Sequence, residues 1–134
     1  MTEPTFSVRH RVDEIERVLT NYLDALYEVD VVKLATALHP RAIYATADGN
    51  ELLFRTMEEY FPVVAERVSP ASRGEAREDA IDSVEFAGEN TAFARVRCAF
   101  SGKRYVDFLT LIRDEGRWQI IAKIFHYEEV PCPT

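Results

Sequence analysis

The amino-acid sequence predicts an α+β domain in which helices pack on a curved antiparallel sheet. Its 134 residues suit one domain, which we expect to span residues 1–134. Helical periodicity is confined to the first half, and the second half consists of strand-like runs separated by short turns. Helices followed by strands favour two segregated layers over alternating βαβ units.

The first helix is predicted over residues 7–28, because apolar residues recur there at helical spacing. They are Val8, Val12, Ile15, Leu19, Tyr22 and Leu26. Asp30 can cap a second helix over residues 31–38, since its carboxylate can accept hydrogen bonds from free backbone N–H groups. His39 and Pro40 should end that helix, because the residue before a proline avoids helical geometry.

A short hairpin and a third helix should follow. Residues 41–46 and 51–55 resemble two strands joined by a tight turn at Asp48 and Gly49. Thr56 and Glu59 fit a capping box, which predicts a helix reaching about residue 67. Pro62 should kink that helix, and residues 69–79 form a polar loop.

The second half predicts an antiparallel meander with strands over residues 80–87, 91–101, 104–113 and 117–126. If Gly102 and Lys103 form a two-residue turn, Cys98 faces Asp107, and Asp107 faces Lys123 across the next turn. The same register places Trp118, Ile120 and other apolar residues on the opposite face. Both faces are therefore largely apolar, which predicts a homodimer formed through the sheet.

Asp107 and Lys123 are charged residues among apolar neighbours in mid-strand. A lone buried charge is very costly, so a pair is the expected arrangement. Two interpretations stay open. The pair is either an ion pair that fixes the register, or a polar anchor inside a pocket where burial would shift both pKa values.

Composition excludes several function classes. The net charge is −7 and the basic residues are scattered beside acids, which argues against nucleic-acid binding. No apolar run is long enough for a membrane helix or a signal peptide, so a cytoplasmic protein is expected. Cys98 and Cys132 are too few for a disulfide scaffold, and the three histidines lack metal-site spacing. We therefore expect no metal and no membrane partner.

Three segments carry a family resemblance. RYVDFLTLIR (residues 104–113) and GRWQIIAKIF (residues 116–125) resemble the C-terminal signature of the putative lumazine-binding branch of the NTF2-like superfamily, which is similar to the SnoaL-like proteins. LHPRA (residues 38–42) resembles the segment that joins helix and first strand there. Gln119 departs from the pattern, because this branch often has a basic residue at that position.

The resemblance implies a cone-shaped α+β barrel, usually homodimeric, with a pocket between helices and sheet. It implies no particular reaction, because the superfamily includes isomerases, dehydratases, polyketide cyclases and members that only bind or assemble. It implies no flavin or lumazine.

Two function hypotheses follow. The first is a small-molecule pocket protein that performs cofactor-independent acid–base chemistry, such as isomerisation or dehydration of a small apolar or cyclic metabolite. The second is a non-catalytic ligand-binding or dimeric assembly module. The candidate catalytic residues are Asp107, His39 and Tyr22. The candidate ligand-binding residues are Tyr44, Tyr60, Phe61, Cys98, Tyr105, Lys123 and Phe125.

Overall fold

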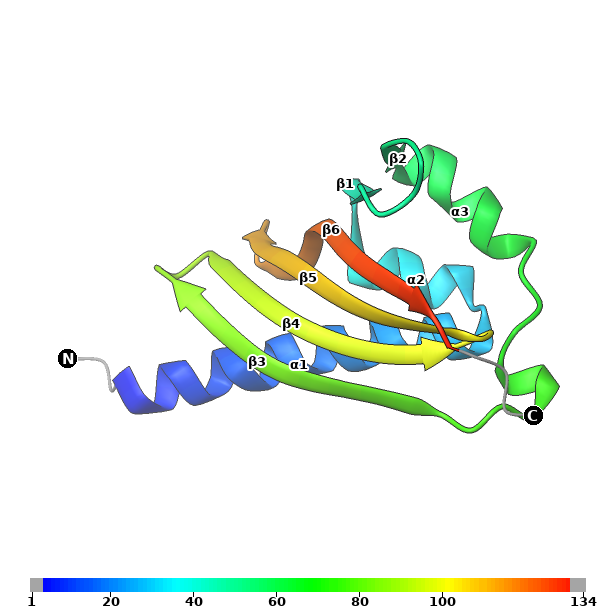
Figure 1. The fold of residues 1–134 in the computed structure, drawn as a ribbon. Helices are drawn as coiled ribbons and strands as arrows, with labels where there is room; N and C mark the ends of the chain where they lie inside the picture. The colour runs from blue at the N-terminus through cyan, green and yellow to red at the C-terminus, as the bar shows by residue number, and fades with distance from the viewer. Residues whose placement is uncertain (1–3, 131–134) are drawn as a thin grey trace.

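A computed structural model describes residues 4–130 of the chain. Within these residues, three α-helices and one 3-10 helix pack against a six-stranded sheet (Figure 1), which confirms the α+β class. The helices are α1 (Pro4–Glu28), α2 (Val31–Ala37), α3 (Met57–Ala65) and the 3-10 helix η1 (Ala71–Arg73). The strands are β1 (Leu38–Thr46), β2 (Leu53–Thr56), β3 (Glu78–Ala87), β4 (Thr91–Phe100), β5 (Lys103–Asp114) and β6 (Arg117–Glu129).

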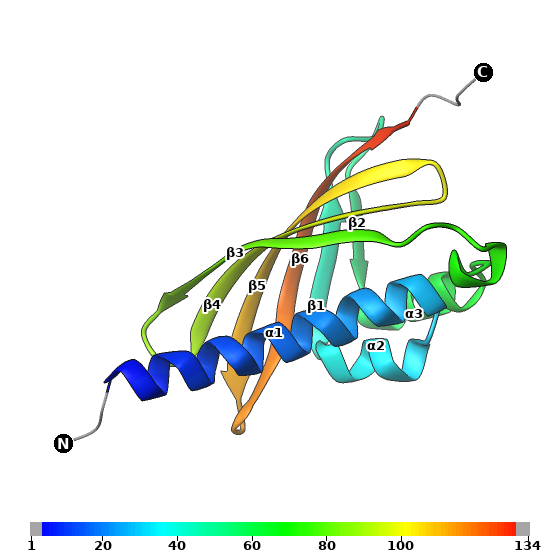
Figure 2. The same cartoon turned by 90° about the horizontal axis from the view of Figure 1, so that it is seen from below.

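The sheet is curved and open. Its strand order is β2-β1-β6-β5-β4-β3, so β2 and β3 are edges and the described strands form no closed barrel. β3 to β6 make the predicted antiparallel meander. β1, however, pairs with β6 in parallel, so the sheet is mixed rather than wholly antiparallel. Helix α1 lies across one face of the sheet (Figure 2), and we call this face the inner face.

The first strand begins earlier than the sequence predicted. β1 starts at Leu38, so His39 and Pro40 lie inside a strand instead of ending α2. The β1–β6 register is irregular between Leu38 and Ile43. A proline is tolerated at such an irregularity, because it has no N–H to donate to a regular ladder. The tight turn at Asp48 and Gly49 is also wrong, since residues 47–52 connect the two strands.

Both helix caps are confirmed. The Asp30 carboxylate accepts from the Lys33 N–H at 3.0 Å and starts α2. The Thr56 hydroxyl accepts from the Glu59 N–H at 3.3 Å, and Glu59 accepts from the Thr56 N–H at 2.9 Å. This capping box starts α3, which contains Pro62 and ends at Ala65 rather than near residue 67.

The hairpin between β4 and β5 shifts the predicted register by two residues. Ser101 and Gly102 form its turn, with φ of 53° and 77°. Cys98 therefore pairs with Tyr105, and Val96 pairs with Asp107. On the next strand Asp107 pairs with Phe125, and Leu109 pairs with Lys123. A shift of two keeps each side chain on its predicted face but changes its direct neighbour.

A bulge in β6 overturns the predicted faces of two large residues. The β5–β6 register shifts between Thr110 and Leu111, where Ile121 is the extra residue. An extra residue reverses the alternation of side chains beyond it. Trp118 and Ile120, predicted on the outer face, are therefore buried in the core.

The core lies between α1 and the inner face of the sheet. Its fully buried side chains include Ile15 and Leu19 of α1 together with Val96, Leu109 and Leu111 of the sheet. No helix in residues 4–130 is both long enough and apolar enough to cross a membrane.

Candidate functional site

A buried acid lies at the centre of the inner face. Asp107, in the middle of β5, is 0% exposed. The Tyr22 hydroxyl of α1 donates to Asp107 Oδ2 at 2.6 Å. Lys123 Nζ, from β6, lies 3.8 Å from the same oxygen, and Lys123 is only 5% exposed. The structure thus brings together three residues that the sequence singled out, from three different elements.

Burial and proximity fix the protonation of Tyr22 and Lys123. Burial raises the pKa of Tyr22 well above its ordinary value, and the nearby Asp107 carboxylate raises it further. Burial alone would lower the pKa of Lys123, but Asp107, Tyr60 and Tyr44 raise it above its ordinary value. Tyr22 is consequently a hydroxyl donor and Lys123 an ammonium, which is unsuited to nucleophilic attack.

Aromatic rings surround the Lys123 ammonium. Its Nζ lies 5.1 Å from the ring centroid of Phe125, 5.2 Å from those of Tyr22 and Tyr44, and 6.0 Å from that of Tyr60. Such cation–π contacts stabilise a cation that is removed from water. A cation–π contact is not a hydrogen bond, however, and the 3.8 Å between Lys123 Nζ and Asp107 Oδ2 exceeds hydrogen-bond length.

Two buried oxygens of this region have no hydrogen-bond partner among the described residues. They are Asp107 Oδ1 and the Tyr60 hydroxyl. Buried polar groups are almost always hydrogen-bonded, and an unsatisfied one costs about 1–3 kcal/mol. We call Asp107, Lys123, Tyr22 and Tyr60 the polar cluster. In this cluster Asp107 Oδ1 can still accept a hydrogen bond, and the Tyr60 hydroxyl can still donate one.

The remaining predicted wall residues surround this cluster. Tyr44 stacks on Tyr60, with ring centroids 4.2 Å apart, and lies 4.8 Å from Phe125. Phe61 packs on the far side of Tyr60 at 6.2 Å. Cys98 is also buried, and burial together with Asp107 raises its pKa to about 12, so its thiol is inert.

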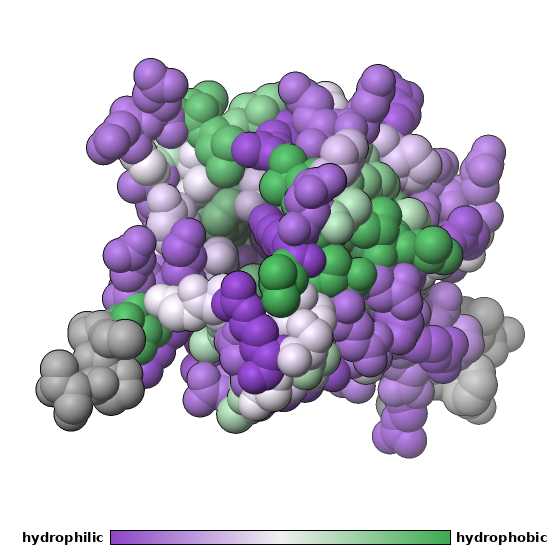
Figure 3. All heavy atoms as spheres, turned by 90° about the vertical axis from the view of Figure 1, so that its right-hand side faces the viewer, coloured by the Kyte–Doolittle hydropathy of each residue, from purple (hydrophilic) through white to green (hydrophobic). Residues whose placement is uncertain are grey.

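A hollow of about 250 Å³ lies between the end of α1, the segment that follows α3, and the β4–β5 hairpin. We call this hollow the mouth. Tyr105 closes its inner side and stacks on Phe100 at 4.9 Å. In Figure 3, which views this end of the molecule, apolar residues gather near the centre among hydrophilic ones. The mouth is lined by Leu26, Val29, Arg67, Val68, Pro70, Arg73, Phe100, Ser101, Lys103 and Tyr105.

Asp107 does not line the mouth. Tyr105 lies between Asp107 and the mouth-lining Lys103, on the same face of β5.

A larger hollow, of about 480 Å³, lies over β3 to β6 and is lined by Arg97, Arg104 and His126 among others. Its Arg97 is paired with Asp82 at 2.7 Å and its His126 with Glu128 at 3.2 Å. Cys98 and Tyr105, two predicted ligand-binding residues, also line this hollow, whereas Asp107 and Tyr60 line neither it nor the mouth. We place the candidate site on the inner face because the unpartnered buried oxygens of the cluster lie there.

The structure does not bring His39 to Asp107. His39 Nδ1 accepts from the Arg41 N–H at 3.0 Å, and its Nε2 contacts Asp114 at 2.9 Å. Asp114 is seven residues from Asp107 along β5, or ~23 Å at the usual rise of a strand. His39 therefore orders the start of β1 and is not a partner of Asp107.

Sequence reasoning missed the mouth itself. Arg67 and Lys103 were not singled out, because Arg67 was expected inside a longer α3 and Lys103 inside the turn. A turn at Ser101 and Gly102, in place of the predicted turn at Gly102 and Lys103, would have placed Lys103 in the next strand and on the inner face. Within residues 4–130, no group of three His, Cys, Asp or Glu side chains is arranged to hold a metal ion.

A family model described as "Putative lumazine-binding" matches residues 10–126. No curated protein matches the chain.

Many solved structures share the fold. An NTF2-like protein of unknown function from Silicibacter pomeroyi is 23% identical, with a TM-score of 0.80 over 96% of this chain and 100% of its own. A second, from Shewanella baltica, is 25% identical, with a TM-score of 0.81 over 96% and 98% of the two chains. A ketosteroid isomerase-like protein from Erwinia carotovora is 17% identical, with a TM-score of 0.66 over 84% and 92%. This last likeness concerns the fold alone.

Proposed function

Since the chain belongs to the "Putative lumazine-binding" family and has the NTF2-like fold, we propose that it binds a small ring-bearing molecule on the polar cluster. The observation that carries this proposal is the pair of unpartnered buried oxygens, Asp107 Oδ1 and the Tyr60 hydroxyl, beside a buried ammonium. The neighbouring aromatic rings would supply the apolar walls that small-molecule sites use.

The cluster favours a guest with both a donor and an acceptor. Asp107 Oδ1 requires an O–H or N–H donor, whereas the Tyr60 hydroxyl and Lys123 ammonium can donate to a carbonyl or hydroxyl oxygen. A hydroxyl, enol or amide group provides both functions at once. A purely apolar guest would leave the buried oxygens unsatisfied and would bind poorly.

A ligand-observed NMR screen tests the proposal. The compounds are small rings that carry a hydroxyl, carbonyl or amide group, and the proteins are the wild type, Tyr60→Phe and Tyr27→Phe. Tyr60→Phe removes the unpartnered hydroxyl and keeps the ring, so binding should weaken. Tyr27→Phe removes a hydroxyl that donates to the Glu75 carbonyl outside the cluster, so binding should persist. No binding to the wild type, or equal binding to all three proteins, refutes the proposal.

A second candidate function is acid–base catalysis, favoured by the 2.6 Å hydrogen bond from Tyr22 that holds the Asp107 carboxylate in place. Asp107 Oδ1 would take a proton from carbon next to a carbonyl, and the Lys123 ammonium would stabilise the enolate oxygen that receives the electron pair. Return of the proton to another carbon completes an isomerisation.

Deuterium exchange separates catalysis from binding. With 2-cyclohexenone in D₂O, the wild type should accelerate exchange of the protons that an enolate would release, and Asp107→Asn should abolish the acceleration. Lys33→Met, a change on the exposed side of α2, serves as the control. Equal exchange rates with the wild type and Asp107→Asn would refute catalysis by Asp107 and would leave only the binding proposal.

The opposite, outer face of the sheet supports a homodimer. Phe93, Phe108 and Ile124 are 38%, 44% and 45% exposed, although each lies in the middle of the sheet. Phe93 and Phe108 are in contact, with centroids 5.5 Å apart. Within residues 4–130 the helices cover only the inner face, so we propose that a second copy of the chain covers the outer one.

A further inference from the structure

The mouth gathers positive charge in an acidic protein. Arg67, Arg73 and Lys103 line it, and no Asp or Glu is among its lining residues. The chain as a whole carries 23 acidic and 16 basic residues. A concave surface lined by one sign of charge concentrates ligands of the opposite sign.

Arg67 is the central cation of the mouth. Its guanidinium lies 5.8 Å from the centroid of the Tyr60 ring, on which Tyr44 stacks. Burial alone would lower the pKa of Arg67, but Tyr60 and Tyr44 raise it above its ordinary value. No carboxylate of residues 4–130 lies within ion-pair distance of Arg67. Arg67 therefore has no carboxylate partner among the described residues, and the guanidinium N–H groups that do not bond Tyr44 are left for an anion.

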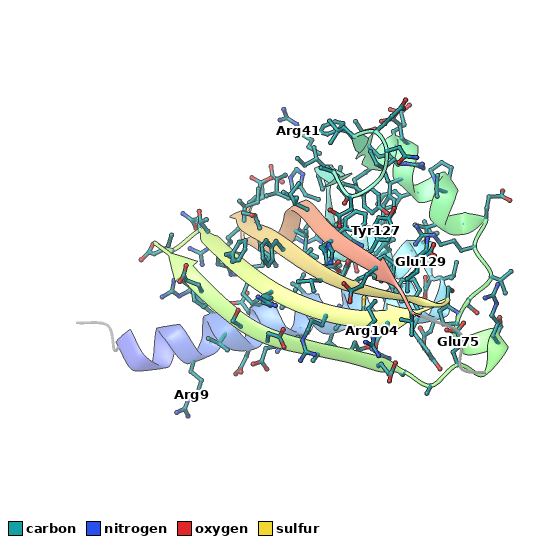
Figure 4. The ribbon with its side chains drawn as sticks, in the orientation of Figure 1. Arg9, Arg41, Glu75, Arg104, Tyr127 and Glu129 are labelled. Atoms are coloured by element: carbon teal, nitrogen blue, oxygen red, sulfur yellow. The ribbon has the colours of Figure 1, made fainter. Side chains whose placement is uncertain are left out.

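The other two cations are less free. Arg73 lies 3.8 Å from Glu75, and Glu75 also accepts from the Ser101 N–H at 2.8 Å. Lys103 lies over the Tyr127 ring at 5.2 Å, and Glu129 is its backbone partner in the β5–β6 ladder. Figure 4 shows Tyr127 and Glu129 on β6 and Glu75 on the loop before β3. The anion-binding role therefore falls mainly on Arg67, with Lys103 in support.

The apolar wall of the mouth fits a planar ring. The Phe100 and Tyr105 rings stack with 22° between their planes, which leaves a flat aromatic surface beside the cations.

We infer that the mouth binds the carboxylate of a small aromatic or cyclic acid, with Arg67 and Lys103 holding the anion and Phe100 and Tyr105 contacting the ring. This inference rests on the proposed function and names its ligand class. Lys103 and Asp107 lie on one face of β5, ~13 Å apart along the strand. A ring acid with a polar group at its far end would span from the mouth toward the polar cluster once the Tyr105 ring moves aside.

The test compares benzoate with benzamide, which differ in charge and little in shape, by isothermal titration calorimetry on the full chain. Benzoate should bind about tenfold more tightly than benzamide at low salt, and sodium chloride should weaken only benzoate. Arg67→Met should remove most of the preference, and Lys103→Met a smaller part. Arg104→Met is the matched control, because Arg104 is next to Lys103 on β5 but points to the outer face, and it should change nothing.

The outcomes separate the two proposals. Equal affinity for benzoate and benzamide, or a preference for benzoate that Arg67→Met leaves intact, overturns the anion site. The polar cluster is tested separately by the NMR screen with Tyr60→Phe. Binding of neither compound also overturns the anion site. Thermal unfolding of each variant shows whether a loss of affinity reflects loss of the fold.

Discussion

Lys123 is the residue whose burial has the largest predicted consequence. Removing its charge by Lys123→Met leaves Asp107 buried beside Tyr22 without a counter-charge. Breaking a buried pair in this way costs about 3–5 kcal/mol of unfolding free energy. Urea denaturation measures the loss. Lys33→Met is the control, since Lys33 pairs with Glu28 at the surface and should lose no more than about 1 kcal/mol. Equal losses in the two variants would show that Lys123 does not neutralise Asp107.

His126 makes stability depend on pH. Glu128 and Asp48 raise its pKa above the ordinary value near 6.5. Because the folded pKa is raised, this contribution is fully present below the unfolded pKa and is lost as pH rises through the folded pKa. His126→Gln should therefore lower the midpoint of thermal unfolding more at pH 5.5 than at pH 8.5. If the loss in the unfolding midpoint is independent of pH, or larger at pH 8.5, the stabilising contacts of His126 with Glu128 and Asp48 are contradicted.

At the residue scale, the sequence predicts which residues form the polar cluster better than it predicts which side chains are in contact. Asp107, Lys123 and Tyr22 could be grouped, because charges in apolar strands need partners and Tyr22 lies on the apolar stripe of α1. His39 could not be placed, since its position depends on a strand that begins at Leu38 and on contact with Asp114. Nothing local to His39 encodes that contact.

The capping box is the element-scale feature that positions Tyr60. α3 begins where Thr56 and Glu59 satisfy each other's backbone N–H groups. Thr56→Ala should cost about 1 kcal/mol, because the Glu59 N–H loses its acceptor. Thr20→Ala is the control, as Thr20 is exposed in mid-helix, where alanine is the better helix former. Denaturation of both variants provides the comparison, and a Thr56→Ala protein as stable as Thr20→Ala would refute the role of the cap.

The predicted elements were largely correct, whereas their register was not. The repeated spacing of apolar residues located α1 and the meander, and the caps located α2 and α3. Two turn geometries are compatible with the residues around Gly102, and they differ by two residues in register. The bulge at Ile121 has no signature in the sequence, and it accompanies the burial of Trp118 and Ile120 in the core.

At the scale of the whole molecule, the outer face of the sheet predicts assembly. Phe108→Glu places a charge at the centre of this face, so the proposed dimer should dissociate to a monomer. Val32→Glu is the control, because Val32 is an equally apolar but highly exposed residue of α2. Sedimentation velocity reports both masses. A monomeric wild type, or a Phe108→Glu protein that remains dimeric, contradicts the proposed interface.

The resemblance read from residues 38–42, 104–113 and 116–125 was sufficient to predict the family, the order of elements and the two-layer architecture. It did not predict that the sheet stays open or that β1 joins β6 in parallel. These features depend on contacts between segments about 80 residues apart, which local patterns do not specify.

The central claim is that the inner face binds a small molecule on the polar cluster, and mapping a bound ligand by protein NMR tests it most directly. 4-Hydroxybenzoate carries both a hydroxyl group, which the cluster is proposed to bind, and a carboxylate, which the mouth is proposed to bind. Its titration should shift the signals of Tyr22, Tyr60, Asp107 and Lys123 and leave those of Phe93, Phe108 and Ile124 unchanged. Shifts confined to the outer face, or no shifts at the polar cluster, would contradict the account.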